Sequence, residues 1–150
     1  MSLKYYLATK VENWNFANEV ADMLTGAGWV QVYRWTSHGN NGNVEHLGDK
    51  VKKEVAETET NGVKDADVLL VLAPGGRGTH VEIGIALGNN KPIFIWAEKE
   101  KDLKSADGQI TTFYYHSLVT RCVCKKEDLI KNALAWGKRF KKNVPTGLWA

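Results

Sequence analysis

Asp67–Ala73 (DVLLVLA) is an almost continuous apolar run, and the glycine-rich segment Pro74–Gly78 (PGGRG) ends it. A strand that helices cover on both faces has this composition, because neither of its faces meets water. A helix is expected to follow at Thr79–Leu87, closed by Gly88-Asn89-Asn90. This strand–loop–helix unit predicts an α/β protein with a mainly parallel sheet at its centre.

The chain on either side of this unit repeats the alternation of strand and helix. Further strands are expected at Lys4–Ala8, Trp29–Trp35, Pro92–Ala97 and His116–Val123. Further helices are expected at Asn13–Ala27, along an apolar stripe from Val44 to about Glu59, and at Glu127–Lys142. Five strands with a helix in each gap predict a flavodoxin-like doubly wound parallel sheet, in the order 2-1-3-4-5, with helices on both faces.

Length and composition indicate one globular domain over residues 1–150, because the chain is 43% hydrophobic and 25% charged. The net charge of +3 is too small an excess to indicate binding to a nucleic-acid polymer or a membrane surface. No apolar run approaches the length of a membrane span, and no secretory signal opens the chain. A cytoplasmic protein is therefore expected.

The cysteines and histidines predict no metal site. Cys122 and Cys124 are expected to point to opposite faces of a strand, so that they form neither a disulfide nor half of a zinc site. His46, His80 and His116 have no partners at metal-ligand spacing. We expect neither a metal nor a cofactor.

The predicted topology places a ligand site without reference to any motif. In the order 2-1-3-4-5 the chain reverses between the first and third strands, and ligands bind at the carboxyl ends of the strands beside that reversal. The site is therefore expected between Tyr6–Lys10 and Pro74–Gly78. Glycines there let the backbone approach a ligand closely, and the unpaired N–H groups of the following helix favour an anion.

Thr79 and Glu82 allow two interpretations. Thr-x-x-Glu at a helix start is the spacing of a capping box, in which each side chain bonds the other residue's backbone N–H. Alternatively, Glu82 lies in the first turn, where the helix dipole favours an ionised carboxylate, and faces the expected ligand crevice. An ionised carboxylate held there could attack a sugar carbon.

The chain resembles the nucleoside 2-deoxyribosyltransferase family over nearly its whole length. The matching pieces are Tyr5–Ala8, Ala66–Val71, Gly78, Glu82–Gly84, Ala86-Leu87 and Asn90–Ile93. The resemblance implies that Glu82 attacks C1′ of a deoxyribose and that Tyr6 orients the Glu82 side chain. It also implies that Glu59, eight residues before Asp67, contacts the base. Gly76 stands where the family commonly has a polar residue that holds the sugar or a 5′-phosphate. The resemblance also implies a homo-oligomer with shared active sites, in which Phe113–His116 approach a neighbouring subunit's site.

A second resemblance is local. Pro74–Glu82 fits the pattern P-G-G-x-G-T-x-x-E of the cytokinin-activating nucleotide phosphoribohydrolases. That likeness implies that the glycine-rich turn holds a 5′-phosphate and that the glutamate takes part in cleaving an N-glycosidic bond. The chain lacks that family's early glycine-rich segments. Both resemblances imply cleavage of the bond between a base and the sugar C1′.

These observations predict an enzyme that transfers a 2-deoxyribosyl group between nucleobases through a covalent glutamyl–sugar intermediate. Two alternatives stay open: an N-hydrolase of (deoxy)nucleoside 5′-monophosphates, and a non-catalytic nucleotide-binding module in which Thr79 and Glu82 only cap the helix. The expected partners are a small-molecule nucleoside or nucleotide and a free nucleobase.

The candidate catalytic residues are Glu82, Tyr6 and Glu59. Glu59 could protonate the departing base if burial raises its pKa, or it could be a solvated residue at the end of a charged helix. Strand alternation lets only one of Tyr5 and Tyr6 face the site. Trp35 and His38 could contact a base, or could serve the core and the surface. Candidate substrate contacts are Ala8, Thr9, Trp35, His38, Gly75, Gly76, Arg77, Gly78, Thr79 and His116.

Overall fold

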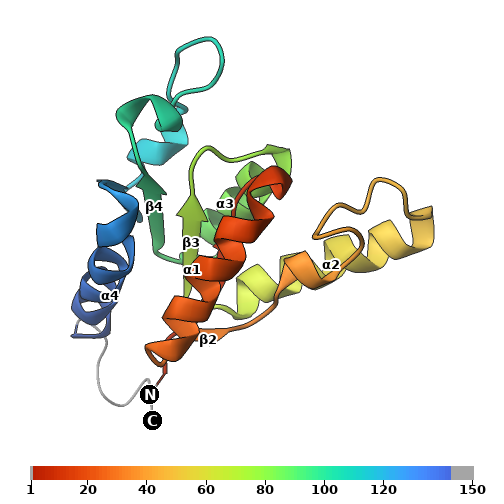
Figure 1. Cartoon of the computed structure of the whole chain (residues 1–150), viewed down its shortest axis with the longest axis horizontal. Helices are drawn as coiled ribbons and strands as arrows, with labels where there is room; N and C mark the ends of the chain where they lie inside the picture. The colour runs from red at the N-terminus through yellow and green to blue at the C-terminus, as the bar shows by residue number, and fades with distance from the viewer. Residues whose placement is uncertain (1, 143–150) are drawn as a thin grey trace.

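A five-stranded parallel sheet forms the centre of the molecule (Figure 1). The computed structural model describes residues 2–142, and the side chains of residues 2–140. The strand order is β2-β1-β3-β4-β5, with every neighbouring pair parallel, as the sequence predicts. Tyr6 pairs with Leu69, and Leu70 with Phe94, at the centre of the sheet. The strands are β1 (Lys4–Ala8), β2 (Val30–Gln31), β3 (Val68–Leu72), β4 (Ile93–Ala97) and β5 (Val119–Val123).

Helices cover both faces of the sheet. α1 (Trp14–Gly26) and α4 (Lys126–Lys142) pack together on one face, and α2 (Asp49–Asp65) and α3 (Arg77–Gly88) pack together on the other (Figure 1). This arrangement confirms the doubly wound α/β fold. Within residues 2–142, no helix is long and apolar enough to cross a membrane.

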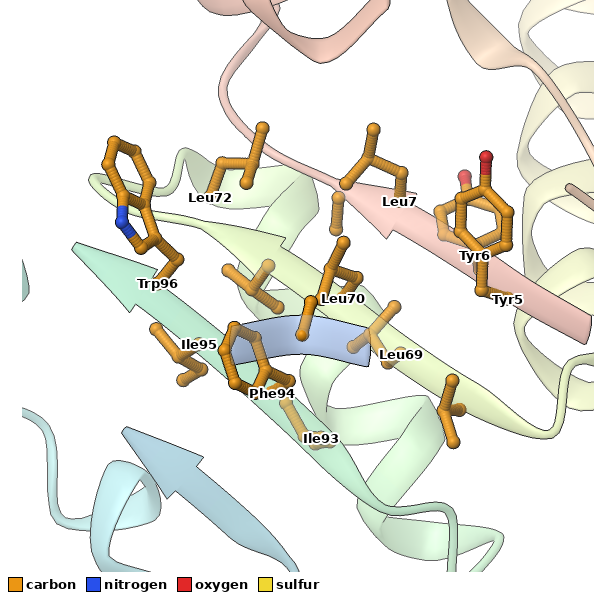
Figure 2. Close-up of a cluster of buried hydrophobic side chains, with 14 of the residues drawn as sticks. Tyr5, Tyr6, Leu7, Leu69, Leu70, Leu72, Ile93, Phe94, Ile95 and Trp96 are labelled. Carbon is orange, nitrogen blue, oxygen red and sulfur yellow. The ribbon is translucent and has the colours of Figure 1, made fainter. Parts of the chain in front are cut away.

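The core lies along β1, β3 and β4, where the buried side chains of neighbouring strands cluster together (Figure 2). Every residue of β3 and β4 is buried, as expected for central strands that helices cover on both faces. Adjacent tyrosines on β1 take opposite directions. Tyr5 donates a hydrogen bond to the Ala21 carbonyl oxygen of α1 over 3.0 Å, whereas Tyr6 points to the face that α2 and α3 cover.

The second strand is shorter than its sequence pattern indicates. A strand was expected over Trp29–Trp35, but only Val30–Gln31 forms one, and a short 3₁₀ helix, η2, covers Trp35–Ser37. The Trp35 indole Nε1 donates a hydrogen bond to the Leu7 carbonyl oxygen over 2.7 Å. With this bond, the chain after Gln31 crosses the end of β1 instead of continuing alongside it. The rest of the segment Trp29–Trp35 therefore alternates between apolar and polar residues without pairing as a strand.

The helices beside the predicted site also differ from expectation at their ends. α2 begins at Asp49, after the first part of the predicted apolar stripe, and continues to Asp65 instead of ending near Glu59. α3 begins at Arg77 instead of Thr79, with Gly76 as its N-cap residue. Between β4 and β5, where the sequence predicts no helix, two 3₁₀ helices form: η3 (Glu100–Leu103) and η4 (Thr112–Tyr115). β5 begins at Val119 rather than His116, and α4 begins one residue earlier than expected.

The expectation that Cys122 and Cys124 face opposite ways is wrong. Residues i and i+2 of an extended chain share a face, and the two Sγ atoms lie 3.7 Å apart. Both cysteines are free and half-buried, and burial raises the pKa of the Cys122 thiol to about 11. In the part of the chain that the structure describes, no group of three or more His, Cys, Asp or Glu side chains is arranged to hold a metal ion.

Candidate active site

A cavity of about 790 Å³ opens at the carboxyl ends of β1 and β3. Its walls are the residues that follow β1, the loop before α2, one face of α2, and the first two turns of α3. This is the position that the strand order predicts, because β1 and β3 flank the point where the chain reverses direction.

Glu82 is the buried carboxyl group of this cavity. Its side chain lines the cavity although the residue is only 8% exposed. The Tyr6 hydroxyl donates a hydrogen bond to Glu82 Oε2 over 2.5 Å. Burial raises the pKa of Glu82 to about 8, with the hydrogen bond from Tyr6 acting in the opposite direction and the charge of Glu59 adding to the increase. The site therefore holds a carboxyl group that titrates near neutral pH.

The Tyr6 hydroxyl is a permanent donor in this pair. Burial first, and then the neighbouring carboxylates Glu82 and Glu59, raise the pKa of Tyr6 far above its ordinary value. The phenol therefore keeps its proton at every pH at which the protein works. A neutral donor of this kind orients Glu82 without neutralising its charge.

The capping interpretation of Glu82 is wrong. The Thr79 hydroxyl oxygen accepts a hydrogen bond from the Gly76 backbone N–H over 3.0 Å, so the capping contact at this helix start is made by Thr79 to the N-cap residue Gly76 and does not involve Glu82. Because α3 begins two residues earlier than expected, Glu82 falls in its second turn and bonds Tyr6 instead of the first amides of the helix. The expected support from the first turn of the helix dipole does not apply at that position.

Besides Glu82, Glu59 is a partly buried carboxyl group on the cavity wall, whereas Glu12 and Glu45 line it as exposed residues. The extended α2 places Glu59 inside the helix rather than at a solvated helix end, and burial raises its pKa. Gly62, one turn later, packs closely on Tyr6: a Cβ atom at Gly62 would lie 3.1 Å from the Tyr6 ring. This close approach brings α2, and with it Glu59, against the strand that carries Tyr6.

The glycine-rich segment and the first turn of α3, which continues from it, form one wall of the cavity. Gly76, Arg77, Gly78 and Thr79 line it. Gly75 lies behind them, and a Cβ atom there would come within 2.7 Å of the Thr79 side chain, so the loop requires glycine at that position. The His80 ring joins this loop to η4, with Nδ1 2.7 Å from the Gly76 carbonyl oxygen and Nε2 2.9 Å from the Tyr114 hydroxyl.

Two cations of the cavity wall have no carboxylate partner. Lys10 and Arg77 line the cavity, and within residues 2–140 neither forms an ion pair. Lys10 lies beside the N-cap of α3, because a Cβ atom at Gly76 would be 3.4 Å from the Lys10 Cβ atom. The start of α3 and two unpaired cations thus share one end of the cavity, which favours an anion there.

The structure brings some of the predicted contact residues to the cavity and leaves others outside it. Thr9 and Trp35 line it, and the Thr9 hydroxyl also donates to the Leu72 carbonyl oxygen over 2.7 Å. Trp35 is only 6% exposed, so it serves the core and the cavity wall together. Ala8 is buried within β1, and His38 and His116 are exposed; none of these three lines the cavity of this chain.

Sequence reasoning missed several residues of the cavity wall. Lys52, Val55 and Ala56 line it beside Glu59 on α2. These residues stand seven, four and three positions before Glu59, and residues with that spacing share one face of a helix. The sequence pattern could therefore have indicated them if the helix had been expected to continue through Glu59. Lys10 ends the segment at which the strand order placed the site, and its close approach to Gly76 puts it on the cavity wall.

The family model described as nucleoside 2-deoxyribosyltransferase matches residues 5–134, which include β1, the glycine-rich segment, Glu59 and Glu82. The chain belongs to the nucleoside 2-deoxyribosyltransferase family. This is a family of enzymes, and the match confirms the resemblance seen in the sequence. No curated protein matches the sequence.

Several solved structures share the fold of this family member. They include a Clostridium botulinum CMP N-glycosidase, BcmB (17% identity, 87% of this chain and 97% of that chain covered, TM-score 0.60). A conserved protein from Enterococcus faecalis is 17% identical, with 87% and 96% covered and a TM-score of 0.65. A 2-deoxyribosyltransferase from Bacillus psychrosaccharolyticus is 16% identical, with 85% and 90% covered and a TM-score of 0.59. At these identities the likeness shows the fold.

Proposed function

We propose that this protein breaks the N-glycosidic bond of a nucleoside and transfers the 2-deoxyribosyl group to a second nucleobase. One observation carries the proposal: Glu82 is a buried carboxyl group on the wall of a cavity, held by a tyrosine hydroxyl. A carboxylate used only for helix capping has no need of a partner from a distant strand. Membership of the family supports this activity, and one of the similar structures is itself a 2-deoxyribosyltransferase.

In the proposed reaction, ionised Glu82 attacks C1′ of the sugar, and the bond between C1′ and the base nitrogen breaks. The sugar passes through an oxocarbenium-like state and becomes an ester of Glu82. Glu59 protonates the departing base, which leaves as a neutral molecule. A nitrogen of the incoming base then attacks C1′ and gives its proton to Glu59, and the Glu82 carboxylate is released.

The test is a base-exchange assay. Incubation with 2′-deoxyadenosine and free cytosine should yield 2′-deoxycytidine and adenine by chromatography, and Glu82→Gln should yield neither. Acid quenching followed by intact-mass measurement should find a deoxyribosyl adduct on the wild-type protein. Free deoxyribose formed in place of 2′-deoxycytidine would contradict transfer, and no cleavage of any nucleoside or nucleotide would contradict the enzymatic proposal.

A second candidate function is hydrolysis of (deoxy)nucleoside 5′-monophosphates. The unpaired cations Lys10 and Arg77 at the start of α3 favour it, as does the N-cap of that helix at Gly76, which lines the cavity. One of the similar structures is a CMP N-glycosidase. In this reaction water, instead of a second base, attacks the sugar ester. Replacing 2′-deoxyadenosine by its 5′-monophosphate in the same assay distinguishes the two functions through kcat/KM and through the product.

We also propose that the protein works as a homo-oligomer with shared sites. Phe113 and Tyr115 on η4 are 60% and 58% exposed, a surface that a neighbouring subunit could cover. Sedimentation equilibrium of the wild type and of Phe113→Ser tests this, with dissociation of the variant as the expected result. A wild-type monomer that is fully active would contradict it.

A further inference from the structure

The Tyr33 hydroxyl is a buried polar group that has no part in the proposed reaction. It is shielded from solvent and has no hydrogen-bond partner within the part of the chain that the structure describes. Buried hydroxyl groups nearly always have a partner, because losing water without compensation is unfavourable. An exception beside an active site indicates a group that finds its partner only when substrate is bound.

The position of Tyr33 is set by the residues of the candidate site. Its ring stacks on the Tyr6 ring, with centroids 6.5 Å apart and planes at 25°, and its other neighbour is the His38 ring at 5.7 Å. Gly62 of α2 lies against both tyrosines, since a Cβ atom there would be 3.1 Å from Tyr6 and 3.3 Å from the Tyr33 Cβ atom. Tyr33 is therefore packed between the strand of Tyr6 and the helix of Glu59.

Glu59 is the acceptor that this geometry makes available. It stands three residues before Gly62, on the same face of α2 as the residue that Tyr33 packs against. Burial, and then the charge of Glu59, raise the pKa of Tyr33 to about 12, so the hydroxyl is a neutral donor. The other carboxyl group nearby, Glu82, already has the Tyr6 hydroxyl as its donor.

We infer that Tyr33 is a positioning residue for Glu59: when substrate fills the cavity, its hydroxyl donates a hydrogen bond to one oxygen of Glu59 and turns the other toward the base. Tyr33 does not line the cavity, so it acts through Glu59 and not by direct contact with the substrate. The inference rests on the proposed function, in which Glu59 protonates the base. The site then contains two matched pairs, Tyr6 with the nucleophile and Tyr33 with the acid.

The experiment compares Tyr33→Phe with Tyr5→Phe, a control from the opposite face of the sheet. Two substrates are used: 2′-deoxyadenosine, and 7-methyl-2′-deoxyguanosine, whose base is already cationic and leaves without a proton. Tyr33→Phe should lower kcat about tenfold for the first substrate and leave the second unchanged. It should cause no further loss in a Glu59→Gln background. Its Tm should not fall, because the hydroxyl has no partner in the free protein, whereas Tyr5→Phe should lower Tm and keep activity.

Equal losses for both substrates, full activity for both, or an undiminished loss in the Glu59→Gln background would overturn the inference. A binding measurement separates it from the proposed function. Calorimetry with 2′-deoxyadenosine should give a Kd about tenfold higher for Glu82→Gln/Tyr33→Phe than for Glu82→Gln alone. A wild-type protein that binds but does not cleave overturns the proposed function, and an unchanged Kd overturns the role of Tyr33. A protein that neither binds nor cleaves overturns both.

Discussion

Tyr6 and Glu82 stand 76 positions apart in the chain, and in the folded protein the Tyr6 hydroxyl lies 2.5 Å from Glu82 Oε2. The pair joins the sheet to α3 at the wall of the cavity. Both side chains are buried, so their hydrogen bond forms where water cannot compete with it. Because of this contact, the Glu82 carboxyl group is held at the cavity by Tyr6 and does not cap α3.

Replacing Tyr6 by Phe removes the donor and leaves the ring. We expect kcat to fall about 10–100-fold, because a hydrogen bond to a charged group no longer orients Glu82. The same change should raise the pKa of Glu82, since the hydrogen bond from Tyr6 lowers it. Steady-state kinetics across pH measure both effects. Tyr5→Phe is the matched control, and a similar catalytic loss in that variant would contradict a specific role for Tyr6.

Replacing Glu82 by Gln should abolish turnover, with a loss of at least about 10³-fold, because the nucleophile is gone.

The same replacement of Glu82 by Gln should stabilise the folded protein in alkaline solution. The folded protein holds a proton on Glu82 between pH 4.5 and about 8 that the unfolded chain has lost, so the free energy of unfolding falls as pH rises through this window. The variant lacks that loss and should be more stable by about 1–3 kcal/mol above pH 8. Chemical denaturation at pH 4 and pH 9 tests this, and a variant less stable than the wild type at pH 9 would contradict it.

The activity of the wild type should depend on pH through the same carboxyl group. Only the ionised form of Glu82 attacks C1′, and its pKa in the free protein is about 8. We therefore expect kcat/KM to rise with pH through the neutral range and to level off or fall above pH 8. A pH series of initial rates with 2′-deoxyadenosine measures the midpoint. A rise that is already complete at pH 5 would show that Glu82 is not desolvated in the working enzyme.

Replacing Glu59 by Gln tests the assignment of the general acid. With 2′-deoxyadenosine the loss in kcat should be about 10²-fold, since the departing adenine then receives no proton. With 7-methyl-2′-deoxyguanosine the loss should be small, because its base leaves as a neutral molecule without help. Comparison of the two rates is the measurement. Equal losses for the two substrates would assign Glu59 to binding alone.

Replacing Arg77 by Ala tests the anion end of the cavity. If 5′-monophosphates are the substrates, this variant should lose about 10–100-fold in kcat/KM for 2′-deoxyadenosine 5′-monophosphate and little for 2′-deoxyadenosine. Lys64→Ala is the matched control, because Lys64 is an exposed cation on α2 outside the cavity. Unchanged kcat/KM for both substrates would favour the nucleoside as the substrate and leave Arg77 as a solvated residue at the start of α3.

The local patterns of the sequence predicted the arrangement of the sheet because they report burial directly. The run Val68–Leu72 is apolar throughout, and in the structure all of it is buried. The prediction of a strand over Trp29–Trp35 was wrong, because alternating apolar and polar residues also occur where a chain crosses the end of a neighbouring strand. The bond from the Trp35 indole to the Leu7 carbonyl oxygen decides that path, and no local pattern reports a partner 28 residues away.

The strand order, the end of the sheet where a ligand can enter, and the carboxyl group that follows the glycine-rich segment were all predicted from the amino-acid sequence. These features follow from periodicity and chain direction, which act over a few residues. The hydrogen-bond partner of Glu82 could not be predicted in this way. Thr79-x-x-Glu82 has the spacing of a capping box, and the contact with Tyr6 exists only because the folded chain brings β1 against α3. The proximity of Glu59 and Tyr33 also depends on the tertiary structure. It requires that α2 continues past Glu59, and that Gly62, which has no side chain, lets α2 approach Tyr6 and Tyr33 closely.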